Sequence, residues 1–491
     1  MGKIVLTPGE KYEPTPGVVL APVGSTVNNT SSNTTRPPHP PVLVKAVLAD
    51  DKEDSWLEYV PEQVAEDPPL IIACHGGGAS AEYQFYETTW WAVCEAEGAI
   101  AVFPNAGGQS RSWLSEDKPT PPGERPSMLE FFTKSPDGRA DEENHHIKFI
   151  KALIEEMKAK YGVDPGRVYM QGMSMGDIMT MMFSRVCGDL LAGGDSTAGP
   201  TPEIALFNED DSLKGYKCPV PTYQSRGELD DIVVAQRPGR EVTTRQDVNA
   251  GNREFWLRVN GCDTPPRLAI LGVNNFAFYT GKNADFIYRD VKHRSHGQTL
   301  DDAQWAWNLL FKHNRREPDG SLTRDRDEFF ETGDRNAIAL CEGAAAAYVD
   351  NKKVILAAPI FARSLTKMNF ATHEREEVSR ELFVAVEDLG RIFGGTGVEF
   401  TNDGRGAIIR TLEKGDFEVV DESAACLRGS FMRAMFMAAT TENGKLSVPL
   451  RWFAEEIFGL QTTQCDGCMY ISDRHGEMTK DMARIIRDLL K

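Results

Sequence analysis

A regular alternation of short apolar runs with longer amphipathic segments constrains the fold of this chain more than any other feature of its sequence. PPLIIACHGGG and AIAVFPN each contain an apolar run that is typical of a buried strand. Residues 145–162 (HHIKFIKALIEEMKAKYG) instead place apolar residues at helical spacing, and RVYMQGMSMG is again a strand that ends at glycine. Strands that alternate with helices predict a mostly parallel sheet with helices on both faces.

The character of the sequence changes twice, and these changes divide the chain into three parts. Residues 1–44 include PVGSTVNNTSSNTTRPPHPPV, a polar, proline-rich stretch that is typical of an extension or linker. The alternation of strands and helices covers residues 45–318, and the charged stretch around residues 312–328 predicts a domain boundary. Residues 329–491 contain a weak repeat at an offset of 64 residues, ELFVAVEDLGRIFGGTGVEF and KLSVPLRWFAEEIFGLQTTQ. We therefore predict an α/β domain followed by a smaller, duplicated α+β module.

Charge and cysteine content argue against several classes of protein. Lys and Arg number 54 against 73 Asp and Glu, and the formal net charge of −19 disfavours binding to nucleic acid or anionic lipid. No apolar run approaches the roughly 20 residues that span a bilayer. Of nine scattered cysteines only Cys465 and Cys468 form a CxxC pair, which we interpret as a turn without metal. The start, MGKIVLTPGEKYEP, lacks a signal-peptide pattern, which leaves open a cytoplasmic protein or an exported one whose leader was removed.

Gly172-Met173-Ser174-Met175-Gly176 is the one GxSxG motif in the sequence. An apolar strand precedes it and the helix-forming run DIMTMMFSRV follows it. This strand–turn–helix context exposes a serine hydroxyl on a strained turn, and the glycines permit a turn in which larger side chains would clash. The motif therefore predicts that Ser174 is a nucleophile.

A serine hydroxyl needs a base to take its proton and a carboxylate to orient that base. CPVPTYQSRGELDDIVV reads as a strand that ends in a loop with Asp230 and Asp231, and the loop before the last helix of the α/β domain holds His293 and His296. In this architecture the serine precedes the acid and the acid precedes the histidine in the chain, and this sequence has that order. We favour Asp230 as the acid over Asp231, and His296 as the base over His293.

The same chemistry requires donors for a developing oxyanion. The loop His75-Gly76-Gly77-Gly78 follows the first buried strand, where backbone N–H groups can point toward such a charge. We predict the amides of Met175 and Gly77 as the donors, with Gly78 as the alternative to Gly77, and His75 as a residue that shapes the loop. The sequence has no GxGxxG loop and no lysine at the spacing of a phosphate-binding loop, so we expect no cofactor.

Aromatic residues flank the predicted catalytic loops. AEYQFYETTWWAVCEAEG follows the oxyanion loop, and the long stretch after the second strand contains Trp113. Loops at the carboxyl ends of parallel strands gather at the ligand site of such sheets. We therefore predict that Tyr83, Trp90 and Trp113 bind substrate and that Met173 and Met175 add an apolar lining.

The runs CHGGGAS, VFPN, VDPGRVYMQGMSMG, RGELDDIVV and SHG resemble the α/β-hydrolase family of polyhydroxybutyrate depolymerases and feruloyl esterases, over residues 45–316. The resemblance implies an α/β-hydrolase fold and a serine carboxylic-ester hydrolase without metal or organic cofactor, acting on an aromatic (feruloyl-type) ester or a polyester. It also implies that Ser174 is the nucleophile, His296 the base and Asp230 the acid. In this family the turn that carries the nucleophile, the elbow, more often reads Ser-Asn-Gly-Gly, whereas here it reads Ser174-Met175-Gly176-Asp177. This difference leaves the substrate class open.

The C-terminal repeat, with KLSVPLRWFAEEIFG and AAYVDNKKVIL, resembles the copper-amine-oxidase N-terminal-like module, whose name implies no copper. This resemblance implies a secreted or cell-surface bacterial protein that is attached to a surface or polymer. Two other functions stay open, a peptidase on the same fold and a surface-binding protein with an inert hydrolase domain. Truncation at residue 320 tests whether the C-terminal module is an anchor, because an anchor is needed for binding to an insoluble polymer but not for turnover of a soluble ester.

Overall fold

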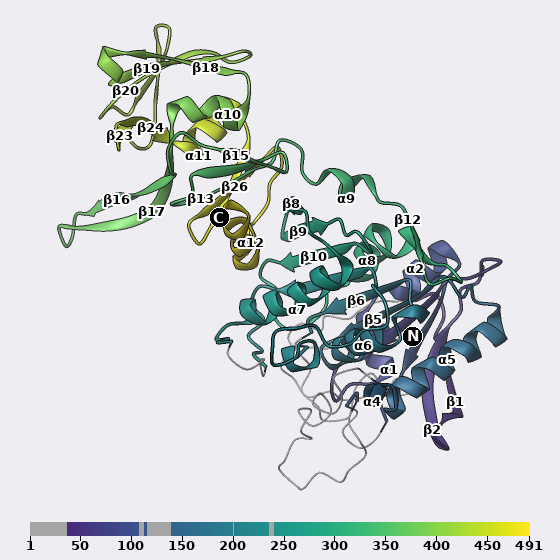
Figure 1. Ribbon diagram of the computed structural model, residues 1–491. Helices are drawn as coiled ribbons and strands as arrows, with labels where there is room; N and C mark the ends of the chain where they lie inside the picture. The colour runs from purple at the N-terminus through teal and green to yellow at the C-terminus, as the bar shows by residue number, and fades with distance from the viewer. Residues whose placement is uncertain (1–36, 108–111, 115–138, 200, 235–239) are drawn as a thin grey trace. The chain divides into compact units, whose positions relative to one another are not determined.

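The computed structural model describes residues 37–107, 112–114, 139–199, 201–234 and 240–491 (Figure 1). The chain forms two compact units, one of Met1–Thr264 and Phe278–Glu331 and the other of Pro265–Ala277 and Thr332–Lys491. Most of the predicted linker over residues 1–44 lies outside the described residues. The segment Pro265–Ala277, which the sequence analysis placed in the α/β domain, is part of the second unit.

Eight neighbouring strands of the first unit follow the order β1-β2-β4-β3-β5-β6-β7-β10 in one sheet. The pairs β1–β2 and β2–β4 are antiparallel, and every later pair is parallel. All residues of the six parallel strands are buried, which explains the uniformly apolar sequences of β3 and β4. The strands are β1 (Val42–Ala49), β2 (Lys52–Tyr59), β3 (Leu70–Cys74), β4 (Ile100–Pro104), β5 (Val168–Met173), β6 (Gly193–Thr197), β7 (Thr222–Gly227) and β10 (Phe286–Val291).

Helices pack on this sheet: α6 lies against β5 and β6, α1 and α2 against β4, and α7 against β10. Among themselves, α2 contacts α8, and α4 contacts α5 and α6. Helix α5 is the one that the apolar spacing predicts, and it ends where Gly162 takes a left-handed φ of 66°. The helices are α1 (Ala81–Glu87), α2 (Trp90–Glu97), α4 (Arg139–Glu142), α5 (His145–Tyr161), α6 (Met175–Val186), α7 (Arg245–Asn260) and α8 (Asp302–Leu309), and a short ribbon of β11 (Asn314–Arg316) and β12 (Leu322–Arg324) follows. The predicted α/β-hydrolase fold is confirmed by this sheet order and its helices.

The second unit is built mainly of antiparallel strands in sheets of five, four and five strands. Their orders are β15-β14-β13-β26-β25, β16-β17-β24-β23 and β18-β19-β20-β21-β22. Strand β9 (Asn274–Tyr279) and helix α9 (Glu328–Thr332) contain points at which the chain passes between the units. The strands are β8 (Arg267–Leu271), β13 (Ile338–Cys341), β14 (Ala346–Val349), β15 (Lys352–Ile355), β16 (Phe361–Asn369), β17 (Glu374–Ala385), β18 (Thr396–Thr401), β19 (Gly406–Thr411), β20 (Gly415–Val420), β21 (Ala425–Arg428), β22 (Phe431–Ala434), β23 (Thr440–Glu442), β24 (Lys445–Pro449), β25 (Gln461–Cys465) and β26 (Cys468–Ser472).

The repeated sequences fold as two strand–helix–strand copies. In the first, β17 leads into α10 (Leu389–Phe393) and β18; in the second, β24 leads into α11 (Leu450–Trp452), a π-helical turn (Phe453–Phe458) and β25. The copies meet where β17 and β24 pair antiparallel, with Val384 opposite Val448. Helix α12 (Lys480–Leu490) closes the chain and packs on β13, β14 and β26. The duplicated α+β module is therefore present as predicted.

The CxxC pair lies in a tight hairpin, but the structure adds a partner that the sequence did not indicate. Cys465 ends β25 and Cys468 begins β26, with Asp466 and Gly467 in the turn at φ values of 48° and 70°. Cys468 forms a disulfide with Cys341, which lies directly opposite it on β13 although the two are 127 residues apart in sequence. The disulfide ties the beginning of the module to its end.

Candidate active site

Ser174 stands between β5 and α6 on a sharply strained turn. Its φ of 56° and ψ of −111° place a non-glycine residue in a region that costs energy, so the surrounding packing must hold it there. A Cβ on Gly172 would lie 1.9 Å from the carbonyl oxygen of Gly176, and a Cβ on Gly176 would lie 2.1 Å from that of Cys74. Both glycines are thus required for the close approach of strand, turn and helix, as the motif predicts.

The predicted acid and base both reach this serine. Nε2 of His296 lies 2.9 Å from Oγ of Ser174, and Nδ1 of His296 lies 2.9 Å from Oδ2 of Asp230. Because a carboxylate only accepts hydrogen bonds, the ring carries its proton on Nδ1 and leaves Nε2 free to accept one from the serine. The alternatives Asp231 and His293 form neither of these bonds, so the structure brings together the favoured set.

The loops that carry the acid and the base are bound to each other. The amide of Glu228 donates to the carbonyl of Val291 and that of Leu229 to the carbonyl of Arg294. The Glu228 carboxylate also pairs with Lys292 at 2.8 Å. Gly227 permits this contact, because a Cβ there would lie 2.5 Å from the carbonyl oxygen of Arg294. The acid and the base therefore keep a fixed separation.

Asp230 is ionised in a buried position. Burial raises its pKa, but the hydrogen bond from His296 and the charge of Arg245 outweigh burial, so its pKa lies below the ordinary value. Nη2 of Arg245 lies 3.1 Å from Oδ2, and the amide of Ile232 donates to Oδ1 at 3.1 Å. A permanent negative charge at this position can stabilise the imidazolium that forms when His296 takes a proton.

The glycine loop after β3 lies against the nucleophile. A Cβ on Gly77 would come within 2.7 Å of Cγ of Met175, and one on Gly76 within 3.6 Å of Cβ of Ser174. The backbone of Gly77 therefore runs beside the first residue of α6, where the helix N-terminus adds partial positive charge. This arrangement agrees with the amides of Gly77 and Met175 as the predicted oxyanion donors.

His75 and Trp113 shape this loop from behind. Nδ1 of His75 lies 2.6 Å from the carbonyl of Gly76, while Nε2 accepts from the amide of Ala106. The indole of Trp113 donates to the carbonyl of His75 at 2.7 Å and is 1% exposed. The ring of Trp113 is thus used to fix the loop, which corrects its predicted role in substrate binding.

Trp90 and Tyr83, which were also predicted to bind substrate, lie in different environments. Trp90 is 1% exposed, stacks on Phe311 and donates to the side chain of Gln171, so it belongs to the core and the prediction that it binds substrate is wrong. Aromatic residues at helical spacing can face either the protein core or a substrate. The spacing alone therefore did not show that Trp90 is a core residue. Tyr83 in α1 is half-buried, and its role in substrate binding stays a prediction.

Curated relatives match part of this chain. The bifunctional acetylxylan esterase/xylanase XynS20E of Neocallimastix patriciarum is 24% identical over 179 residues, 36% of this chain and 22% of that protein. Feruloyl esterase B of Neurospora crassa is 27% identical over 141 residues, 29% of this chain and 42% of the esterase. Poly(3-hydroxyalkanoate) depolymerase C of Paucimonas lemoignei is 28% identical over 143 residues, 29% of this chain and 30% of the depolymerase. The chain is a relative of these esterases and depolymerases.

The predicted resemblance to this group is thereby confirmed, while the resemblance of the C-terminal module to the copper-amine-oxidase N-terminal-like module stays a prediction. The chain spans less than half the length of each of these esterase and depolymerase relatives. No model of a protein family matches it. A solved acetyl xylan esterase from Aspergillus awamori aligns with 54% of the chain, at a TM-score of 0.40 and 14% identity.

The described residues contain neither a cluster suited to a metal ion nor a helix suited to crossing a membrane. Residues 37–107, 112–114, 139–199, 201–234 and 240–491 contain no cluster of His, Cys, Asp and Glu side chains that is suited to a metal ion. Over the same ranges, no helix combines the length and the apolar character that crossing a membrane requires.

Asp177, where this chain departs from the more common elbow sequence, does not face the nucleophile. Its side chain is fully buried, and Thr201 donates to its Oδ2 at 2.9 Å. A Cβ on Gly199 would overlap this carboxylate, so the glycine provides the space that the acid occupies. Burial raises the pKa of Asp177. The unusual acid of this esterase relative therefore belongs to the structure behind the elbow and not to the ester-binding surface.

Arg245 is the main residue of the site that the sequence analysis missed. It occupies the first turn of α7, 2% exposed at its side chain, and its guanidinium also donates to the carbonyls of Ile232 and Gly199. An arginine 15 positions after the acid forms no motif with it. Only the folded chain shows that Arg245 contacts Asp230, at the same Oδ2 that His296 contacts.

We expect Arg245→Met to reduce activity most at low pH. A positive charge lowers the pKa of Asp230, so its removal raises that pKa and protonates the acid at a higher pH. The charge on Asp230 stabilises the fold above the pKa it has in the unfolded chain, and this contribution is lost as pH falls through the folded pKa. The acid limb of kcat/KM should move to higher pH, with about a tenfold loss on that limb. Arg245→Lys should recover part of the shift; an unchanged profile in the Met variant would contradict the expectation.

Proposed function

We propose that this protein is a serine carboxylic-ester hydrolase that acts through an acyl-enzyme. The observation that supports it is the continuous hydrogen-bonded chain from Asp230 through His296 to Ser174, which stands on a strained elbow. In the first step, Oγ of Ser174 attacks the ester carbonyl carbon while its proton passes to Nε2 of His296. The imidazolium then protonates the leaving alkoxide, the alcohol departs, and the acyl group stays on Ser174.

Water completes the reaction by the same route. His296 takes a proton from the water as it attacks the acyl carbon, and returns that proton to Oγ of Ser174 as the carboxylic acid leaves. In both steps the carbonyl oxygen becomes negatively charged. The amides of Gly77 and Met175, held beside the nucleophile, are our proposed donors to this oxyanion, and such a donor is worth about 10²- to 10³-fold in kcat.

We propose a hydroxycinnamate ester of a plant-wall polymer as the natural substrate, with a polyester as the alternative. The names of the relatives support the class, since they include feruloyl esterases, an acetylxylan esterase and a polyhydroxyalkanoate depolymerase. The half-buried Tyr83, in the helix that follows the oxyanion loop, supports the aromatic preference. A triad of this kind also cleaves amides, so an amide substrate tests the peptidase alternative, and turnover itself tests the inert-domain alternative.

A substrate panel tests the proposal with the full chain. Initial rates are measured with p-nitrophenyl acetate, methyl ferulate, acetylated xylan and polyhydroxybutyrate, and with casein as an amide substrate. We expect turnover of methyl ferulate and of p-nitrophenyl acetate, and none of casein. Hydrolysis of short aliphatic esters alone would reject the aromatic preference. No hydrolysis of any ester would reject the enzyme itself.

We further propose that the protein works in an oxidising compartment outside the cytoplasm. The Cys341–Cys468 disulfide supports this, because such bonds form and persist mainly in exported proteins. Attachment to a polymer through the second unit is part of the same proposal. It is tested with a chain that ends at Glu331, the last residue of the first unit: this chain should keep turnover of a soluble ester and lose binding to the insoluble polymer.

A further inference from the structure

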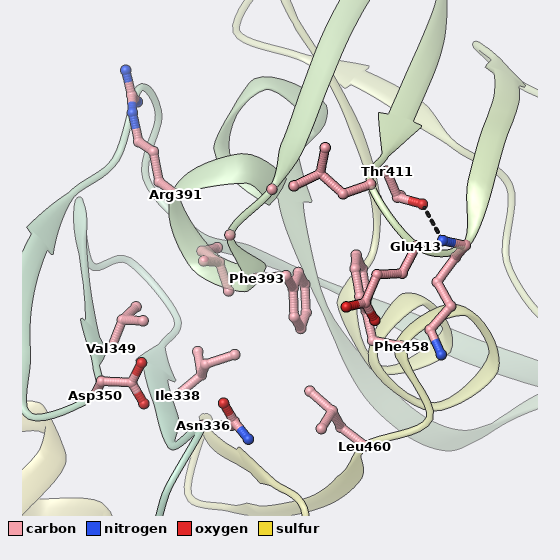
Figure 2. Close-up of a pocket in the computed structure, with 15 residues that line it drawn as sticks. Asn336, Ile338, Val349, Asp350, Arg391, Phe393, Thr411, Glu413, Phe458 and Leu460 are labelled. Atoms are coloured by element: carbon pink, nitrogen blue, oxygen red, sulfur yellow. Dashed lines mark hydrogen bonds between the residues drawn. The ribbon is translucent and has the colours of Figure 1, made fainter.

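The second unit contains an open cavity of about 520 Å³ that the proposed hydrolysis does not use. Its volume lies in the range of small-molecule sites, roughly 300–1,000 Å³. Its walls come from the end of α10, from the turn between β19 and β20, from β13 and β14, and from the segment that joins the π-helical turn to β25 (Figure 2). Both copies of the repeat therefore contribute to it.

Each copy places one phenyl ring in this cavity. Phe393 ends α10 in the first copy and Phe458 ends the π-helical turn in the second, and each is followed by glycine. The two rings stack at a centroid distance of 4.1 Å and an interplanar angle of 11°, and both are half-buried. Ile338 and Leu460 extend the apolar surface beside them. The centre of the cavity thus contains a stacked pair of partly exposed phenyl rings.

The turn between β19 and β20 presents an exposed leucine at the rim. Leu412 is 87% exposed, and its amide donates to the carbonyl of Gly395 at 3.1 Å, so the turn is docked beside the rings. A Cβ on Gly395 would lie 2.9 Å from Cδ1 of Leu412, which shows how closely the two segments pass. A large apolar side chain kept in water at the rim of an aromatic cavity is suited to contact with a ligand.

Polar groups stand on opposite sides of the rings. Asp350 and Asn336 lie on one side and Glu413 on the other (Figure 2), and Lys414 also lines the rim. Arg391 points away from the rings and pairs with the buried Asp388 at 2.5 Å. The cavity therefore offers two carboxylates as hydrogen-bond acceptors, and one lysine and one amide as donors, around an apolar centre.

We propose that this cavity binds a neutral oligosaccharide. A sugar ring combines an apolar C–H face, which packs on the electron-rich face of an aromatic ring, with an edge of hydroxyls. Those hydroxyls donate to Asp350 and Glu413 and accept from Asn336 and Lys414. An anionic ligand such as a uronate or a free hydroxycinnamate would meet two carboxylates, which makes it the weaker ligand.

The experiment is isothermal calorimetry of the full chain with xylohexaose and cellohexaose, and with trigalacturonate as an anionic sugar. Wild type should bind at least one neutral sugar and bind trigalacturonate at least tenfold more weakly. Glu413→Gln and Asp350→Asn should each weaken binding of the neutral sugar by about tenfold, the loss that accompanies a hydrogen bond to a charged group. Leu412→Ala should weaken it by severalfold.

Phe370→Ala is the matched control, because Phe370 is 85% exposed in the loop between β16 and β17 and does not line the cavity. It should bind as wild type does. Absence of binding to both neutral sugars, equal binding of trigalacturonate, or wild-type affinity in the Glu413, Asp350 and Leu412 variants would each overturn the proposal. All these variants should hydrolyse a soluble ester at the wild-type rate. Calorimetry does not depend on turnover, so failure of the proposed hydrolase would leave this test intact.

Discussion

Ser174→Ala should lower kcat for p-nitrophenyl acetate by at least about 10⁴-fold, because it removes the nucleophile and leaves only oxyanion stabilisation and substrate binding. The residual rate of such variants comes from those two contributions, so a small activity above the uncatalysed reaction is expected. KM should change little, since the hydroxyl contributes to bond formation more than to binding. The measurement is the steady-state rate of wild type and variant at equal concentration.

The control for this variant is its folding. Alanine at position 174 keeps the positive φ of 56°, so its thermal stability should match wild type, whereas Ser174→Gly should gain about 1 kcal/mol by relief of backbone strain. An inactive alanine variant with an unchanged melting temperature assigns the loss to chemistry. Equal activity of wild type and Ser174→Ala would show that another residue is the nucleophile.

The sequence predicted those parts of the site that short motifs or the order of strands and loops along the chain specify. Gly172, Ser174 and Gly176 lie within five consecutive residues, and their close packing on β3 and α6 is a property of that one turn. The acid and the base followed from chain order and from their places in the loops after two strands, which pair in the same sheet. The alternation of strands and helices gave the fold for the same reason, since apolar runs such as those of β3 and β4 report burial directly.

The parts that sequence did not predict depend on contacts between distant segments. Strand β6 has the sequence GGDST and is fully buried, so it contains no apolar run that would predict a strand. Cys341 and Cys468 meet only because β13 and β26 pair, and Arg245 meets Asp230 only because α7 returns to the sheet. Trp113 illustrates the reverse error, in which an aromatic residue near catalytic loops is used to hold one of them.

The assignment of the acid gives the second large effect. We expect Asp230→Asn to lower kcat by about 10⁴-fold while Asp231→Asn stays within about threefold of wild type. In the native chain Oδ2 of Asp230 accepts the proton of Nδ1 and so leaves Nε2 of His296 unprotonated toward Ser174. An amide in that position can donate to Nδ1 instead, which places the ring proton on Nε2, where it prevents the base from accepting the serine proton.

The two substitutions are a matched pair, since each replaces one carboxylate by an amide of the same size in neighbouring positions of one loop. Asp230 is 3% exposed and contacts His296, Arg245 and the amide of Ile232, whereas Asp231 is exposed to solvent. The loss in Asp230→Asn should be in kcat, with the serine still in place but deprived of a base. A loss in Asp231→Asn with full activity in Asp230→Asn would reverse the assignment. Equal losses would show that both act by supporting the loop, because only the residue bound to Nδ1 can set the tautomer of His296.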